Sequence, residues 1–295
     1  NLVENYMQDC RVHLKPTTLA NKHHLISTKL LPYFADMPIC DIDISTVRKW
    51  QNELISHENG YAPTYLKTVH NQLSAIFNFA VKYYKLPSNP ASACGSMGKK
   101  KAESMQFWTK EEFDSFIKCV SDKPLSKVVF HLFFYSGMRE GELLALTLND
   151  FDFDNNTVSI TKNYARLGYE EIIQAPKTPK SKRTITLPAE IMEMVKEYSS
   201  MLYDYKPTDR LFLTSKQSLT REMIRGCTAS GVKRIRIHDL RHSHASLLIE
   251  LGFAPLLISE RLGHENIETT LNTYSHLYPN KHGEVAEILS KLIQN

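Results

Sequence analysis

A helical period of apolar side chains between Pro63 and Lys85 is the feature that most restricts how this chain folds. The residues that recur there at steps of three and four are Leu66, Val69, Leu73, Ile76, Phe77 and Ala80, so they share one face of a helix. Pro63 suits the first turn of a helix, whereas Pro87 and Pro90 cannot continue one. The pattern predicts a long amphipathic helix over residues 63–85.

Two shorter helical patterns precede the long one, from Thr17 or Thr18 to Leu31 and from Ser45 to His57. Each opens with a hydroxyl residue suited to capping. Together these patterns predict an all-α domain of about four helices over residues 1–94. Residues 95–107 are small, glycine-containing and then basic, which is typical of a linker. A length of 295 residues also corresponds to roughly two domains.

The second domain, residues 108–295, begins with helical patterns. Thr109 and Glu112 form a capping-box pattern, and an apolar helix is expected over 128–135 before Ser136-Gly137 interrupts it. Helical spacing resumes over 139–148.

Strand patterns follow in the same domain. Apolar and polar residues alternate over 157–161 and 184–187, which predicts a short antiparallel sheet. Helical patterns return from Ile191, with breaks near Pro207, Gly231, Gly252 and Gly263. We therefore expect a mixed, mainly α domain with a small antiparallel β-sheet.

Composition excludes several classes of protein. Apolar residues make up 42% and charged residues 23%, as in globular proteins, so disorder is not expected. No apolar run approaches the roughly 20 residues that span a bilayer, and no leader pattern is visible. The five scattered cysteines lack a C-x-x-C pair, which disfavours a disulfide scaffold or structural zinc. We expect a cytoplasmic chain without membrane contact that, because it begins at Asn1, is part of a longer protein.

Positive charge is concentrated locally although the net charge is only +4. Residues 1–105 hold 12 basic and 8 acidic side chains. Residues 210–241 contain Arg210, Lys216, Arg221, Arg225, Lys233, Arg234, Arg236 and Arg241 against Glu222 and Asp239. Such stripes on a nearly neutral body suit an anionic polymer, although solvated helix faces carry similar charge.

The first candidate for chemistry is the segment 136–146. It contains Arg139 at an expected helix start and Glu142 three residues later, a spacing at which the carboxylate can hold the guanidinium. Taken alone, these residues are better explained as a surface ion pair beside a capping glycine.

The second candidate is His238 with Arg241, which share a helix face at a spacing of three. Arginine offers a planar fork for two phosphate oxygens, and histidine exchanges a proton near neutral pH, so the pair indicates an anionic target. A metal site of His238, His242 and His244 is the competing interpretation. The step of two between 242 and 244 turns those rings to different helix faces, which disfavours it.

The third candidate is Leu262-Gly-His264 followed by Tyr274. Gly263 is expected to end one helix, and Tyr274 lies on or near the inner face of the next. A tyrosine in such a place is usually part of the core.

In chain order, Arg139, His238-x-x-Arg241, Leu262-Gly-His264 and Tyr274 resemble the catalytic signature of the tyrosine recombinase (phage integrase) family. The resemblance covers about residues 108–295, and the preceding helices are similar to the family's SAM-like core-binding domain. The segment 269–276 is similar to integrases of Gram-positive phages and conjugative transposons. Such integrases usually carry a further small N-terminal arm-binding domain, which agrees with a chain that is part of a longer protein.

The resemblance implies a role for each signature residue. Arg139, His238, Arg241 and His264 would surround the scissile phosphate, and Tyr274 would be the nucleophile, with no metal or other cofactor. Tyr278 is a second tyrosine on the same helical face, but the spacing of Tyr274 from Leu-Gly-His fits the family.

Two further residues take supporting roles by the same resemblance. Glu142 would be a supporting acidic residue. The family's hairpin lysine, a general acid for the leaving 5′ oxygen, is best matched by Lys177, with Lys180 and Lys182 as alternatives.

These roles are chemically consistent. Attack on a phosphodiester adds charge to its oxygens, which fixed cationic donors stabilise more in the transition state than in the ground state. The phenol must lose its proton near pH 7, to a neighbouring base such as a neutral histidine. The 3′-phosphotyrosine and free 5′-hydroxyl that result allow rejoining to a different strand without ATP.

The implied partner is double-stranded DNA at attachment or transposon-end sites. Candidate DNA contacts are Lys99, Lys100, Lys101, Lys180, Lys182, Arg183, Arg225, Lys233, Arg234 and Arg236. An amphipathic segment at about 284–293 would dock on a neighbouring protomer, in a tetramer that forms on DNA from a protein monomeric without it; docking in cis is the alternative. An excisionase or a host DNA-bending protein is a further implied partner.

Three other functions share some of these features. A DNA-binding regulator of the same fold would lack part of the signature, a histidine metallonuclease would need a divalent metal, and a related topoisomerase would relax supercoils without exchanging strands. Every signature position is filled here. We therefore expect site-specific DNA recombination, the integration or excision of a mobile element.

Overall fold

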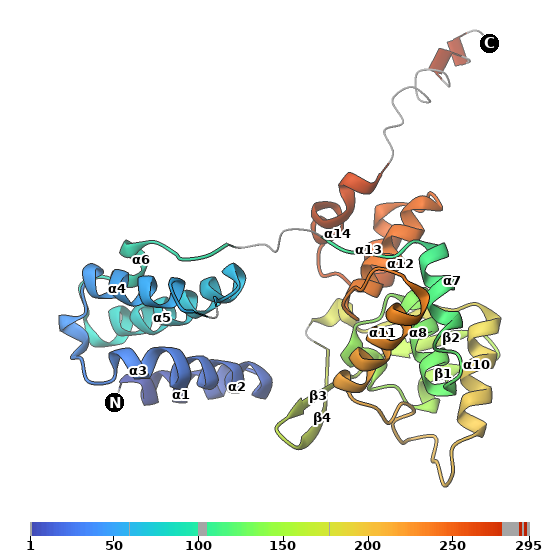
Figure 1. The fold of residues 1–295 in the computed structure, drawn as a ribbon, viewed down its shortest axis with the longest axis horizontal. Helices are drawn as coiled ribbons and strands as arrows, with labels where there is room; N and C mark the ends of the chain where they lie inside the picture. The colour runs from blue at the N-terminus through green and yellow to red at the C-terminus, as the bar shows by residue number, and fades with distance from the viewer. Residues whose placement is uncertain are drawn as a thin grey trace. The chain divides into compact units, whose positions relative to one another are not determined.

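The computed structural model describes residues 2–58, 60–99, 105–176, 178–278, 289–290 and 292–293, and the main division of the chain into two compact units falls between residues 104 and 105. Figure 1 shows the elements of each unit. No helix among these residues has the length and apolar character needed to cross a membrane.

The first unit is helical. Its elements are α1 (Leu2–His13), α2 (Pro16–Leu25), the π-helical turn η1 (Ile26–Leu30), α3 (Leu31–Phe34), the 3-10 turn η2 (Ile39–Asp41), α4 (Ile44–Ile55), α5 (Pro63–Tyr84) and α6 (Pro90–Cys94). The long helix predicted over 63–85 is confirmed, because α5 ends where Lys85 adopts a left-handed conformation. The unit has more helices than the four expected, since η1 divides the pattern that ends at Leu31 and Pro90 starts a further helix.

The predicted hydroxyl caps of the first unit are wrong. Asp43 caps α4, accepting a hydrogen bond from the backbone N–H of Thr46 at 2.7 Å, so Ser45 lies inside the first turn. Helix α2 starts at Pro16 without a side-chain cap. Proline suits the first helical position because its φ is already helical and the N–H that it lacks would have no partner within the helix.

Helix α6 and the residues that follow it pack on the rest of the first unit. Ala91, Cys94 and Met97 are buried in its core, and the backbone N–H of Lys99 donates to the carbonyl oxygen of Pro63 at 3.1 Å. The packed unit therefore reaches at least residue 99.

The second unit is mainly helical. Its helices are α7 (Lys110–Lys118), α8 (Pro124–Ser136), α9 (Glu140–Leu143), α10 (Ala189–Ser200), α11 (Lys216–Ser230), α12 (Asp239–Glu250), α13 (Pro255–Leu262) and α14 (Ile267–Tyr274), with 3-10 turns η3 (Leu148–Asp150), η4 (Pro179–Ser181) and η5 (Ser275–Leu277). The capping box of Thr109 and Glu112 is confirmed. The helix expected over 139–148 is wrong in extent, because α9 covers only four residues.

Two small antiparallel sheets complete the second unit. Strands β1 (Phe151–Asp152), β2 (Thr157–Ile160) and β5 (Arg183–Thr186) form one, and β3 (Asn163–Leu167) with β4 (Glu170–Gln174) forms the other. The predicted alternation is confirmed, since Val158 pairs with Ile185 and both are buried. The register also pairs Ile160 with Arg183.

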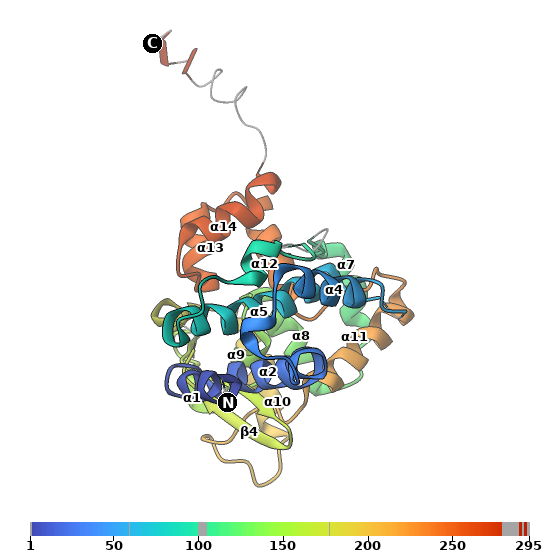
Figure 2. The same ribbon diagram turned by 90° about the vertical axis from the view of Figure 1, so that its left-hand side faces the viewer.

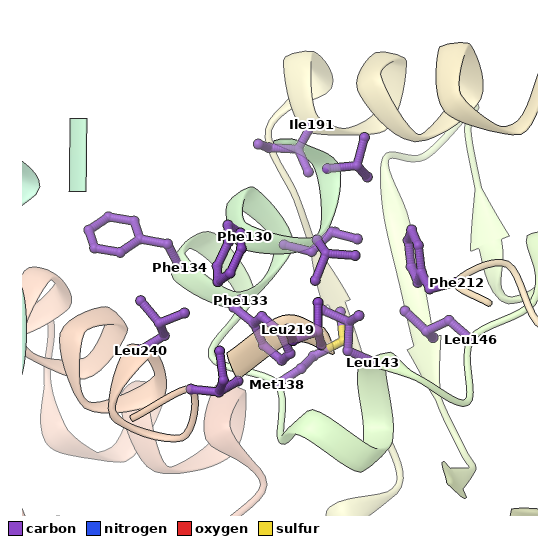
Figure 3. Packing of buried hydrophobic residues seen from close by; sticks show 14 of the residues in the cluster. Phe130, Phe133, Phe134, Met138, Leu143, Leu146, Ile191, Phe212, Leu219 and Leu240 are labelled. Atoms are coloured by element: carbon purple, nitrogen blue, oxygen red, sulfur yellow. The ribbon is translucent and has the colours of Figure 1, made fainter. Parts of the chain in front are cut away.

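Helix α8 runs through the core of the second unit. Figure 3 shows Phe130 and Phe133 of α8 packed near Ile191, Leu219 and Leu240, which come from three other helices. A smaller apolar cluster contains Ala245, Ile249, Ile258, Leu262 and Tyr274. Helices α13 and α14 of this cluster lie side by side in both views (Figures 1 and 2).

Candidate active site

The turn that ends α8 begins the site. Gly137 there has a φ of 64°, in the left-handed region that favours glycine. A Cβ on this residue would lie 2.7 Å from both His244 Cδ2 and Leu262 Cδ2, closer than atoms can approach. Its carbonyl oxygen accepts a hydrogen bond from Nη1 of Arg241 at 2.7 Å. The turn therefore joins α8 to α12 at this point.

Arg139 is held by Glu142 and by the turn after α13. Its Nη1 lies 2.6 Å from Oε1 of Glu142, and its backbone N–H donates to Oε2 of the same residue at 2.9 Å. Its Nη2 donates to the carbonyl oxygen of Gly263 at 3.2 Å. The ion pair expected from the spacing of three is thus present, and the guanidinium is fixed from two sides.

Glu142 is shared by a second arginine. Only 2% of Glu142 is exposed, and Nη2 of Arg183 lies 3.0 Å from its Oε2. Burial alone would raise the pKa of this carboxyl, but the charges and hydrogen bonds of Arg183 and Arg139 outweigh it, so the pKa is lowered. The carboxylate therefore stays ionised between two guanidinium groups.

The donors of Arg183 go to protein oxygens. Besides Glu142, Nε donates to the carbonyl oxygen of Arg261 at 2.7 Å and Nη1 to that of Ser181 at 3.0 Å. These bonds favour a role in positioning over the contact with DNA that the sequence suggested.

Arg241 is the most deeply buried cation of the group. Its exposure is 4%, and among the described residues its Nη2 has no hydrogen-bond partner. Burial, followed by the nearby charges of Arg139 and Arg183, lowers its pKa to about 9, so it remains charged at pH 7. A buried guanidinium with an unpaired donor is costly unless an anion meets it.

His264 follows the left-handed residue Gly263 at the end of α13. Its Nδ1 lies 2.7 Å from Oγ1 of Thr270, which fixes the ring. Burial, and then the charges of Arg241 and Arg139, lower its pKa to about 3. The imidazole is therefore neutral at physiological pH.

Tyr274, the last residue of α14, is 1% exposed, as its expected inner position requires. Its phenolic oxygen lies 2.7 Å from Nδ1 of His242. Burial raises the pKa of the phenol to about 12, although the charge of Arg241 opposes this shift. The phenol is thus protonated at neutral pH, and the imidazole of His242 lies within hydrogen-bond distance of its oxygen.

His238 precedes the first residue of α12 without capping it through its side chain, and it lies next to His242, with the ring centroids 5.5 Å apart. Desolvation, followed by nearby positive charge, lowers the pKa of His238. His244 points elsewhere: its Nδ1 lies 2.8 Å from the carbonyl oxygen of Phe134 and its Nε2 accepts from Arg261 at 3.0 Å. Within the described residues no three His, Cys, Asp or Glu side chains gather as metal ligands do.

Of the candidate lysines, Lys177 lies outside the described residues. Lys180 and Lys182 line a pocket of about 720 Å³ together with Arg183 and His264. These two lysines therefore share a pocket with one arginine and one histidine of the site.

The remaining basic candidates are mostly ion-paired. Arg225 lies 2.8 Å from Asp122 and 2.9 Å from Glu222, Lys233 lies 3.2 Å from Glu112, and Arg236 lies 2.7 Å from Asp239. Arg234 is exposed. Lys99 belongs to the first unit, whereas Lys100, Lys101 and most of the predicted helix 284–293 lie outside the described residues.

Sequence comparisons find the phage integrase family. Residues 106–281 match the family described as "Phage integrase family", and residues 1–55 match "Phage integrase, N-terminal SAM-like domain". The chain is 29% identical to the ICEBs1 integrase of Bacillus subtilis (strain 168), covering 99% of this chain and 82% of that protein. It is 25% identical to the integrase of Staphylococcus phage L54a, covering 95% of this chain and 88% of that one.

Solved structures share the fold. The Tn1549 transposon integrase in complex with transposon right end DNA superposes with a TM-score of 0.77 at 20% identity, covering 100% of this chain and 99% of that chain. A lambda integrase dimer bound to a COC′ core site gives a TM-score of 0.68 at 17% identity, covering 91% and 95%.

Proposed function

Because this chain belongs to the phage integrase family of tyrosine recombinases, we propose that it carries out site-specific recombination of double-stranded DNA for a mobile element. Related proteins of such elements include the ICEBs1 integrase and the Tn1549 integrase, the latter solved with transposon DNA. The reaction is a transfer of DNA strands that preserves phosphodiester bonds and needs neither metal nor ATP.

The unpaired donor of Arg241 is the observation that carries the proposal. Its Nη2 is buried without a protein partner among the described residues, close enough to Arg139 and Tyr274 for their charges to affect its pKa. A phosphate oxygen is a suitable acceptor, because arginine forms short, charge-assisted hydrogen bonds with phosphate. With Arg139, His238 and His264 around it, this position suits the scissile phosphate.

Tyr274 is the nucleophile in this proposal. Its oxygen attacks phosphorus, the P–O5′ bond breaks, and the DNA 3′ end is joined to the tyrosine. Arginine and histidine donors stabilise the charge that develops on the non-bridging oxygens. The released 5′ oxygen takes a proton, and the reverse reaction with a 5′-hydroxyl from another strand completes the exchange.

A lysine supplies the proton for the leaving 5′ oxygen. We assign this role to Lys177, with Lys180 and Lys182 as the alternatives. Both alternatives line the pocket that contains His264.

We further propose assembly into a tetramer on DNA through the C-terminal segment. Leu251, Leu256 and Leu257 are exposed apolar side chains at the end of α12 and on α13, with exposures of 63%, 57% and 46%. In the predicted helix 284–293, the described residues Leu289 and Leu292 are also exposed. Burial of both apolar sets against each other, between neighbouring protomers, removes them from water.

The test uses a duplex that carries the element's end sequence with a nick near the cut site. The wild-type protein is expected to form a covalent adduct with this DNA, and Tyr274→Phe is expected to bind the same DNA without forming one. Tyr278→Phe is the matched control and should form the adduct.

Other results would point to other functions. DNA binding by the wild-type protein with no adduct indicates the catalytically silent regulator. Adduct formation by Tyr274→Phe would overturn the choice of nucleophile.

A further inference from the structure

His242 contacts the oxygen that forms the new bond. Its Nδ1 lies 2.7 Å from the phenolic oxygen of Tyr274, and the two rings meet edge to face with centroids 5.6 Å apart. We propose that His242 accepts the phenolic proton when Tyr274 attacks DNA, an inference that rests on the proposed recombinase function. His242 is then a catalytic residue beyond Arg139, His238, Arg241 and His264.

Because the phenol of Tyr274 is buried, its contact with His242 is the path by which it loses its proton. Tyr274 is 1% exposed, so bulk water has little access to the phenol. Among the described residues, the bond to His242 is the hydrogen bond that the phenolic oxygen makes. A base must lie within hydrogen-bond reach of the proton that it removes, and Nδ1 of His242 meets this condition.

Within the described part of the chain, none of the other histidines near the site is hydrogen-bonded to the phenolic oxygen of Tyr274. Nδ1 of His264 is bonded to Thr270, and both nitrogens of His244 are bonded, to Phe134 and Arg261. The ring of His238 lies 5.5 Å from that of His242 and is solvent-exposed. His242 is therefore the histidine that is in place to take the phenolic proton.

The environment of His242 keeps its imidazole neutral and so able to accept a proton. Burial is the largest influence and lowers the pKa of His242; Asp239 opposes this shift, and the charges of Arg241 and Arg236 add to it. His238, His264 and Tyr274 complete the titratable groups that face it. The imidazole is therefore neutral before the reaction, and Asp239 partly compensates the imidazolium that forms.

The step balances without any further reactant. The O–H bond of Tyr274 breaks and its proton moves to Nδ1 of His242. The phenolic oxygen forms a bond to phosphorus, and the electron pair of the P–O5′ bond leaves with the 5′ oxygen, which is protonated by the lysine. In the rejoining step His242 returns the proton to Tyr274.

The experiment measures single-turnover adduct formation on the nicked duplex with His242→Asn and His242→Ala. Asparagine places an oxygen near the position of Nδ1 and keeps a hydrogen bond to the phenol, but it cannot take the proton. Both variants are expected to be slower by about 100-fold or more, with unchanged DNA binding and unchanged thermal unfolding for His242→Asn. His276→Ala, at an exposed histidine of η5, is the control and should keep the wild-type rate.

Two readouts separate proton transfer from positioning. Raising the pH above 7 should accelerate His242→Ala by about tenfold per unit, because the ionised fraction of the phenol rises, while the wild-type rate rises less. A substrate with sulfur at the bridging 5′ position releases a thiolate that needs no acid. It should rescue Lys177→Ala and leave the His242 variants slow.

Several outcomes would overturn the role of His242. Wild-type rates in His242→Asn, rescue of His242→Ala by the sulfur substrate, or an equal loss at every pH would each do so. Failure of the wild-type protein to form any adduct would instead reject the recombinase function itself.

Discussion

Nη1 of Arg241 donates a hydrogen bond to the carbonyl oxygen of Gly137, 2.7 Å away and 104 positions earlier in the chain. This bond pairs Nη1 of the guanidinium with the protein, while Nη2 has no partner among the described residues. The left-handed turn at Gly137 therefore sets the direction in which the free donor points.

Gly137→Ala should disturb both stability and cleavage. The added Cβ would lie 2.7 Å from His244 and Leu262, in a backbone conformation that disfavours alanine. We expect a loss of about 1–3 kcal/mol in the free energy of unfolding and a slower cleavage step, measured by urea titration and single-turnover kinetics. Gly252→Ala is the matched control, because Gly252 also has a positive φ but open space around it. Equal effects of the two changes would contradict this account.

Glu142→Gln should destabilise the protein strongly. It leaves the guanidinium groups of Arg139 and Arg183 without their shared counter-charge in a buried place. We expect a loss of roughly 3 kcal/mol by chemical denaturation, together with slower adduct formation. Glu171→Gln removes the partner of Arg210 at a half-exposed position and should cost less than about 1 kcal/mol. A similar loss in both variants would show that burial of the carboxylate is not the cause.

His244 should make stability fall at mildly acidic pH. Burial, and then the charge of Arg261, lower the pKa of His244 to about 3, whereas the unfolded chain has a value of about 6.5. Between these values the unfolded state binds the proton and the folded state does not, so stability is lost as pH falls below about 6.5. At pH 5 this cost is about 2 kcal/mol.

The comparison of pH 7.5 with pH 5 tests this directly. His264 contributes in the same direction, so a pH dependence remains when His244 is replaced. In His244→Gln the difference in unfolding free energy between the two pH values should shrink by about 2 kcal/mol. An unchanged difference would mean that His244 is protonated in the folded protein.

Tyr278→Phe should leave stability unchanged or raise it by up to about 1 kcal/mol, because the Tyr278 hydroxyl is buried and lacks a partner within the described part of the chain. Tyr274→Phe should lower stability by about 1 kcal/mol, since it removes the bond to His242. Thermal unfolding of the two variants in parallel checks the contrast. The reverse order would contradict the hydrogen bonds of the structure.

The sequence predicts features that depend on neighbouring residues. The apolar period of α5, the capping box at Thr109 and the end of α8 at Gly137 all follow from local spacing and backbone preference. The inner position of Tyr274 and its closeness to Arg241 also agree with the expected signature.

Features that depend on distant partners could not be predicted. Arg183 meets Glu142 across 41 positions, and His242 meets Tyr274 across 32, so no local pattern distinguishes these residues from their neighbours. The basic stripe of 210–241 looks uncompensated in the sequence, yet Arg225 and Lys233 take acidic partners from 112–122. The cap of α4 depends only on neighbouring residues, but the sequence does not decide which residue it is, because Asp43 and Ser45 are both suitable caps.

The buried position of Tyr274 also bears on the fate of the cut DNA strand. A phosphotyrosine at this residue would hold its ester oxygen beside His242, at the edge of the apolar cluster that contains Ile249 and Leu262. Hydrolysis of that ester would then be slow, and the broken strand would wait for an incoming DNA hydroxyl. The packing of one small apolar cluster would thereby protect the cut DNA from a permanent break.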